Sequence, residues 1–199
     1  VRGARFAGFI KLGRIVSLVL IAPALWLIVE SAWAEWNLRR AFPQLNSFET
    51  SFEWQQLVYN PARVDAHLTN RLHSHGQQAL AVQLKPGASA GLRLRVCYGD
   101  WRHYNHFVVD LYNPGAEPLS LSLRLSDTLH DRGEDKYNDR FNRTLVLAPG
   151  WNTQRIAIAD IQQSPATREL QMDKLCNLGL FVSDIQQTQH FYIDNLRLE

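Results

Sequence analysis

The sequence predicts an all-β fold, an antiparallel β-sandwich or jelly roll, preceded by one N-terminal membrane (or signal) helix. Three observations support this prediction. Apolar and polar residues alternate along short segments, turn signals separate these segments, and one uncharged apolar run lies near the N-terminus. The chain has 199 residues, of which 46% are hydrophobic and 20% charged, a composition that excludes an acidic disordered tail.

The first element is the apolar run from Ile15 to Val29, which Arg14 precedes and Glu30 follows. A membrane-spanning helix needs about 20 apolar residues, whereas the apolar part of a signal peptide has about 7–15. Two interpretations stay open. Ala32-Trp33-Ala34 fits a cleavage pattern, but Arg14, Trp33 and Trp36 can extend an anchor into the membrane interface. We expect an anchor.

Charge indicates on which side of the membrane the rest of the chain lies. Residues 1–34 carry a net charge of +3, and residues 35–199, with 17 basic and 18 acidic side chains, carry −1. Basic residues before an apolar run stay in the cytoplasm, so we expect residues 37–199 on the periplasmic side of a bacterial inner membrane. A near-neutral exported part also argues against a nucleic-acid partner.

The chain divides into residues 1–36 as membrane or signal segment, 37–46 as linker and 47–199 as β-domain. The clearest strands contain Leu119, Leu121, Leu123 and Leu125, or Leu92, Leu94 and Val96, each alternating with polar residues. Further strands are expected at Ala79–Leu84, His106–Tyr112, Thr144–Leu147, Gln154–Ile158, Leu178–Val182 and Phe191–Leu198. Short helical turns are expected at Ile161–Gln163 and Thr167–Lys174.

Catalytic motifs give little support for an enzyme. Gly87-Ala88-Ser89-Ala90-Gly91 matches G-x-S-x-G, but a nucleophile elbow needs a helix after the serine. The alternating segment Leu92–Val96 follows instead, so we interpret residues 87–91 as a hairpin turn. Cys97 and Cys176 would form a disulfide in an oxidising compartment, yet Cys97 has the polar parity of its strand. Their pairing stays open.

Several segments, in this order, resemble a known family. They are Leu45–Glu49, Gly99–Trp101 with Tyr104, Val109–Pro114, Asp127 with His130, Tyr137–Asn142, Leu147–Asn152 and Tyr192–Leu198. This order resembles the galactose-binding-like jelly rolls, which include many carbohydrate-binding modules. It is most similar to the domain found behind VanZ-like membrane domains in bacterial envelope proteins. The resemblance covers residues 45–199 and implies that the apolar run is the last membrane helix of a longer chain.

The resemblance also implies a structural calcium ion. Its ligands would include Glu49 on the first strand and Asp194 in the last. Calcium takes six to eight oxygen ligands, so a carboxylate near each end of the domain would tie the first strand to the last. The alternative is that both side chains face solvent or cap turns.

The expected function is that of a non-catalytic, membrane-tethered, carbohydrate-binding-like module. Aromatic rings stack on sugars, and planar polar groups bind their hydroxyls. On this basis the predicted ligand-binding residues are Trp54, Trp101, Tyr104, His130, Tyr137, Asp139 and Arg140. One alternative is a protein-interaction or structural domain of an envelope assembly, with these aromatic residues buried. A less favoured one is an envelope hydrolase, which requires apposed carboxylates or a Ser–His pair.

Overall fold

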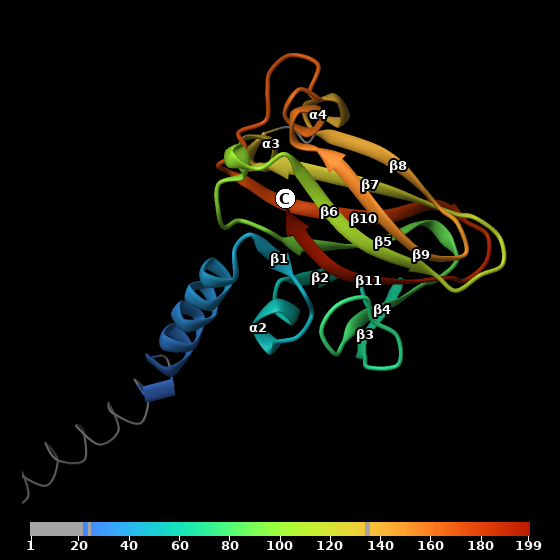
Figure 1. Cartoon of the computed structure of the whole chain (residues 1–199), viewed down its shortest axis with the longest axis horizontal. Coiled ribbons are helices and arrows are strands. Elements are labelled where there is room, and N and C mark those ends of the chain that lie inside the picture. The colour runs from blue at the N-terminus through green and yellow to red at the C-terminus, as the bar shows by residue number, and fades with distance from the viewer. Residues whose placement is uncertain (1–21, 24, 134–135) are drawn as a thin grey trace, which may run out of the picture. The chain divides into compact units, whose positions relative to one another are not determined.

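The computed structural model describes residues 22–23, 25–133 and 136–199 (Figure 1). The chain forms two compact units, Val1–Asn37 and Leu38–Glu199. In the first unit, every described residue is helical. Much of the predicted apolar run, residues 15–21 and 24, lies outside the described residues. Within the part that is described, no helix is both long enough and apolar enough to cross a membrane.

The second unit is built from two antiparallel sheets. The six-stranded sheet has the order β3-β4-β11-β6-β9, and β1 also pairs with β11. Its strands are β1 Gln44–Asn46, β3 Val64–Thr69, β4 Ala79–Leu84, β6 His106–Asn113, β9 Gly150–Ala157 and β11 Gln189–Leu198. The five-stranded sheet has the order β2-β5-β10-β7-β8. Its strands are β2 Leu57–Tyr59, β5 Gly87–Arg95, β7 Leu119–Asp127, β8 Phe141–Leu147 and β10 Leu175–Ile185.

Short helices occupy the connections between strands. They are α2 Ser51–Trp54, η1 Trp101–His103, α3 Thr128–Arg132, η2 Tyr137–Asp139 and α4 Ile158–Gln162. The helical turn expected at Ile161–Gln163 overlaps α4, but residues 167–174 are not helical.

The core lies between the two sheets and confirms the alternating strand pattern. Leu121, Leu123 and Leu125 of β7 are fully buried, as is Leu94 of β5, and the polar residues between them face outward. Because side chains alternate between the faces of a strand, the same alternation that buries these leucines sets the outer face of the five-stranded sheet.

Two boundaries differ from the sequence prediction. Residues 87–91 are not a turn: they form the first half of β5, and the chain turns before them at Lys85-Pro86. The expected linker 37–46 is largely part of the β-domain, because β1 pairs with β11 and Leu45 is buried in the core. A strand of three residues is too short to show a period of two, so the sequence pattern did not reveal β1.

A disulfide joins Cys97 to Cys176. Cys97 lies two residues beyond the end of β5, so the alternation of that strand no longer dictates where its side chain points. The backbone is held there by a hydrogen bond from the amide of Val96 to the carbonyl of Cys176, 2.8 Å long. The parity argument against the bridge therefore did not apply at this position.

Candidate functional site

A groove of about 680 Å³ crosses the outer face of the five-stranded sheet. Its floor comes from β5, β10 and β7, and residues of β2 and of the segment before β8 form its sides. Strand register places Gly179 of β10 directly opposite Arg93 of β5 on one side and Arg124 of β7 on the other. In the next outward row Phe181 of β10 lies opposite Gly91 and Ser122.

The absence of a side chain at Gly179 leaves the middle of this face hollow. A Cβ atom added at Gly179 would lie 3.6 Å from Nε of Arg124 and 3.8 Å from Cγ of Arg93. The two arginine side chains therefore flank one bare stretch of backbone. A side chain longer than alanine at position 179 would project into the space between them, so the glycine keeps the groove open.

The described lining of the groove is basic and partly aromatic. It contains Arg63, Arg93, Arg124 and Arg140, together with the half-buried ring of Phe181, and no Asp or Glu side chain. Arg63 donates from Nη2 to the carbonyl of Ser89, over 3.3 Å. Tyr59 is the second aromatic residue of the lining, so the surface offers cationic donors and aromatic side chains to a bound molecule.

Arg140 connects the groove to a predicted ligand residue. Its Nε donates to Oδ1 of Asn142 over 3.1 Å, and its guanidinium lies 5.4 Å from the ring centroid of Tyr137. Tyr137 is 65% exposed, so its ring is available to solvent where it covers Arg140. Arg140 thus lines the groove, and Tyr137 lies against it at the rim.

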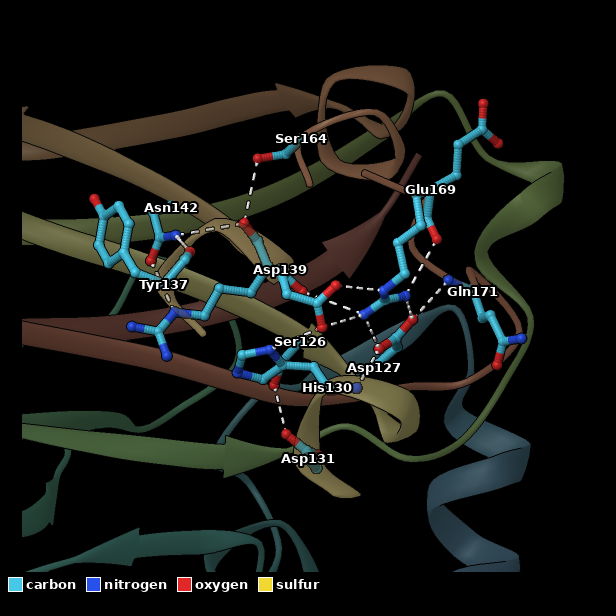
Figure 2. Close-up of polar contacts among 12 residues, drawn as sticks. Ser126, Asp127, His130, Asp131, Tyr137, Asp139, Asn142, Ser164, Glu169 and Gln171 are labelled. Carbon is cyan, nitrogen blue, oxygen red and sulfur yellow. Dashed lines mark hydrogen bonds and ion pairs between the residues drawn. The ribbon is translucent and has the colours of Figure 1, made fainter. Parts of the chain in front are cut away.

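A second group of residues, the ion-pair cluster, consists of Asp127, His130 and Asp139, which Figure 2 labels, together with Arg168. Asp127 is fully buried and accepts hydrogen bonds from Nη1 and Nη2 of Arg168, at 2.6 and 2.9 Å. The same guanidinium donates to both carboxylate oxygens of Asp139, at 2.5 and 2.9 Å. His130, which is buried, places Nδ1 3.3 Å from Oδ2 of Asp139.

The ion-pair cluster shifts the titration of its carboxylates. Hydrogen bonds from Arg168 hold the pKa of Asp139 below its ordinary value. Burial acts to raise the pKa of Asp127, but hydrogen bonds from Arg168 and from the amides of Gln171 and His130 outweigh it and leave that pKa low. Both carboxylates are thus ionised and already occupied by partners within the chain, as expected of a structural clamp.

The predicted ligand residues do not lie together in one site. Trp101 is fully buried and stacks on Phe107 with 5.8 Å between ring centroids, so its inclusion was wrong: it is a core residue. Trp54 and Tyr104 are partly buried and pack against the core outside the groove. His130 and Asp139 belong to the ion-pair cluster. The partner of Asp139 is Arg168 rather than its neighbour Arg140, a pairing that sequence proximity could not indicate.

Other groove residues were missed although their pattern was visible. Arg93 and Arg124 occupy the polar positions of the two clearest alternating strands, and Gly179 and Phe181 lie in a third. The alternation indicated that these side chains share the outer face of their own strands. It could not indicate that β10 lies between β5 and β7, because strand order is set by long-range pairing.

The outer face of the six-stranded sheet carries a separate aromatic row. Tyr112 lies between Trp151 and Tyr192, at centroid distances of 5.2 and 5.8 Å, and the rings meet edge to face. Trp151 is 38% exposed. This aromatic row is a second surface on which a sugar ring could stack.

The two predicted calcium ligands hold one loop. Oε1 of Glu49 accepts from the amides of Gln77 and Gln78, at 2.7 and 2.8 Å. Oδ2 of Asp194 accepts from the amides of Ser74 and His75, at 2.7 and 2.8 Å. Glu49 lies in the connection between β1 and α2 rather than on the first strand, and together with Asp194 of β11 it holds residues 74–78 in place.

One oxygen of this arrangement is left over. Oδ1 of Asp194 is buried and has no hydrogen-bond partner among the described residues, and burial raises the pKa of this carboxyl. A buried carboxylate oxygen with open lone pairs is a suitable calcium ligand. Within the described residues no group of three or more His, Cys, Asp or Glu side chains could hold a metal, so backbone carbonyls would have to supply the other ligands. Calcium stays a prediction.

Comparisons with known proteins identify the fold. No protein-family model and no curated protein sequence matches the chain. Among solved structures, a family 11 carbohydrate-binding module from Clostridium thermocellum, in complex with a beta-1,3-1,4-mixed-linked tetrasaccharide, superposes with a TM-score of 0.60. The two are 12% identical, and the match covers 78% of this chain and 93% of the module.

An exo-beta-agarase superposes with a TM-score of 0.61 at 14% identity, covering 78% of this chain but only 24% of the agarase. The chain therefore has the jelly-roll β-sandwich fold of carbohydrate-binding modules, as the sequence predicted.

Proposed function

We propose that residues 38–199 form a non-catalytic carbohydrate-binding module and that its ligand lies in the groove on the five-stranded sheet. The observation that carries this proposal is the groove itself, open because of Gly179 and lined by polar side chains and the ring of Phe181. A sugar chain needs such a surface: a ring for its C–H face and directed donors for its hydroxyls. The fold of the family 11 module, which is seen with a bound tetrasaccharide, supports the same class of function.

The groove does not resemble a hydrolytic site. Glycoside hydrolysis uses two carboxylates on either side of the bond, and the described lining contains none. The carboxylates of the ion-pair cluster are bound to Arg168, so they do not serve as a free acid and base. Binding without cleavage is the function that these side chains support.

The location of the module forms part of the proposal. We infer that the N-terminal segment tethers it to a bacterial inner membrane, with residues 37–199 on the periplasmic side, in the manner of domains that follow VanZ-like membrane domains. The basic residues before the apolar run support this orientation, and the Cys97–Cys176 bridge is typical of an oxidising compartment.

Affinity electrophoresis and calorimetry of the purified chain against a panel of soluble polysaccharides test the function. Two variants test the location: Gly179→Trp fills the groove, and Trp151→Ala shortens the aromatic row on the other sheet. We expect binding of at least one polysaccharide, its loss in Gly179→Trp and its retention in Trp151→Ala. Absence of binding to every polysaccharide would overturn the function. Loss confined to Trp151→Ala would move the site to the other sheet.

A further inference from the structure

Two exposed arginines follow strand β5: Arg93, which lines the groove, and Arg95, which lies just beyond its lining. Arg93 and Arg95 are two residues apart on β5, so both project from the outer face of the five-stranded sheet, about 6.5–7 Å apart along the strand. Both are exposed, and within the described part of the chain neither has a hydrogen bond or ion pair through its side chain. Arg63 lies near the other end of β5, and among the described residues its side chain has one hydrogen-bond partner, the carbonyl of Ser89.

Two further arginines line the same groove. Arg124 faces Arg93 across Gly179, and Arg140 lines the groove beyond it. These two arginines have other partners, so the charge of the groove that lacks a counter-charge among the described residues is that of Arg63 and Arg93, and Arg95 adds a further charge beside the groove. Residues 35–199 as a whole carry a net charge of −1, which makes the concentration of arginine on this face a local feature.

Like charges held this close repel one another unless an anion lies between them. An arginine guanidinium also has a specific preference, because its planar fork donates two parallel hydrogen bonds to a carboxylate or a sulfate. A neutral sugar chain would take hydrogen bonds from these guanidinium groups but would leave their charge without a counter-charge. A chain whose units carry acidic groups would bind each of them while a sugar ring contacts Phe181.

We propose that this groove binds an acidic polysaccharide, one whose sugar units carry carboxylate or sulfate groups, and that Arg93 and Arg95 recognise those groups. This inference rests on the proposed function and specifies its ligand class. A domain with a net charge close to zero can still carry a basic groove on one face, as this one does.

Polymer pairs that differ only in charge test the inference. Polygalacturonate is compared with its methyl-esterified form, and dextran sulfate with dextran, by affinity electrophoresis and calorimetry of the purified chain. We expect binding to at least one acidic member and not to its neutral partner. Raising NaCl from about 50 to about 500 mM should weaken that binding, because salt screens exposed charges.

Matched variants place the recognition at β5. Arg93→Gln should weaken binding of the acidic polymer about tenfold or more, and the double variant with Arg95→Gln should weaken it further. Arg71→Gln removes the same charge from an exposed loop outside the groove, so its affinity should stay within about twofold of the parent. Melting temperatures of all variants establish that they are folded.

The possible outcomes separate the two proposals. Equal binding of the acidic and neutral members of a pair keeps the carbohydrate-binding function and overturns the acidic ligand. Equal weakening by Arg71→Gln and Arg93→Gln, or equal affinity for single-stranded DNA and the acidic polymers, shows attraction to any polyanion and also overturns it. Failure to bind any polysaccharide overturns the proposed function itself.

Discussion

Single side chains give the groove and its adjoining cluster opposite electrostatic character. In the ion-pair cluster the guanidinium of Arg168 lies between two carboxylates, one of them fully buried, and every charge has a partner. The side chains of Arg93 in the groove and Arg95 beside it have no hydrogen-bond or ion-pair partner among the described residues. A buried charge must be paired, because desolvation is costly, whereas an exposed charge without a partner is available to a ligand.

Arg168→Gln should lower the free energy of unfolding by about 3–5 kcal/mol, because it leaves the buried carboxylate of Asp127 without its counter-charge. Urea denaturation followed by fluorescence measures the change. Arg143→Gln is the matched control: it breaks an exposed pair with Asp160, 2.9 Å long, and should cost under about 1 kcal/mol. Equal effects of the two substitutions would contradict a structural role for the ion-pair cluster.

The same cluster predicts acid sensitivity. Because the folded pKa values of Asp127 and Asp139 lie below the unfolded value of about 3.9, their stabilisation is present above that pH and is lost as pH falls through the folded values. Unfolding free energies measured from neutral pH to about pH 3 should therefore fall in the parent chain. The fall should be smaller in Arg168→Gln, and parallel pH profiles would contradict this assignment.

At the scale of strands, two glycines of the five-stranded sheet have different roles. A Cβ at Gly91 would collide with Cβ of Phe181 and the carbonyl of Leu180, whereas one at Gly179 would meet only side-chain atoms at 3.6–3.8 Å. Gly91 therefore allows β5 and β10 to approach each other, and Gly179 keeps the groove open. Glycine is needed for strand packing at position 91 and for an open groove at position 179.

Gly91→Ala should lower the free energy of unfolding by about 1–3 kcal/mol, the usual cost of overpacking. Gly179→Ala should raise it by about 0.5 kcal/mol, because alanine loses less backbone entropy than glycine in a strand. Thermal and urea denaturation of the pair give the two signs directly. A stable Gly91→Ala chain would show that the two strands can separate without penalty.

For the whole domain, long-range links close the sandwich. The disulfide joins positions 79 residues apart, and Glu49 and Asp194 bring the first and last parts of the domain to one loop. The disulfide and the two carboxylates each connect chain segments that are far apart in the sequence.

Replacing Cys97 and Cys176 by serine should lower the free energy of unfolding by about 2–4 kcal/mol, because the unfolded chain regains the freedom of a long closed loop. Denaturation of the double variant measures the loss. The parent chain in reducing buffer should show a similar decrease, and a parent chain indifferent to reductant would indicate that the two thiols are not paired.

If calcium binds at Asp194, melting temperatures should be higher in calcium than in EGTA, since a ligand that binds only the folded state stabilises it. Glu49→Gln should reduce this difference while magnesium has little effect on the parent. Identical melting curves of the parent chain in calcium and in EGTA would eliminate the calcium site.

The sequence by itself determined the β-sandwich, because alternation along Leu119–Leu125 and Leu92–Val96 is a local property that burial then confirms. It also predicted Arg140 as a site residue, and that residue lines the groove. Only the tertiary structure decided that Trp101 is core, that Asp139 pairs with Arg168, and that Arg93, Gly179 and Arg124 form one row. Period-two patterning indicates which face of its own strand a side chain occupies. The order of strands depends instead on contacts between residues far apart in the chain, and that order creates the groove.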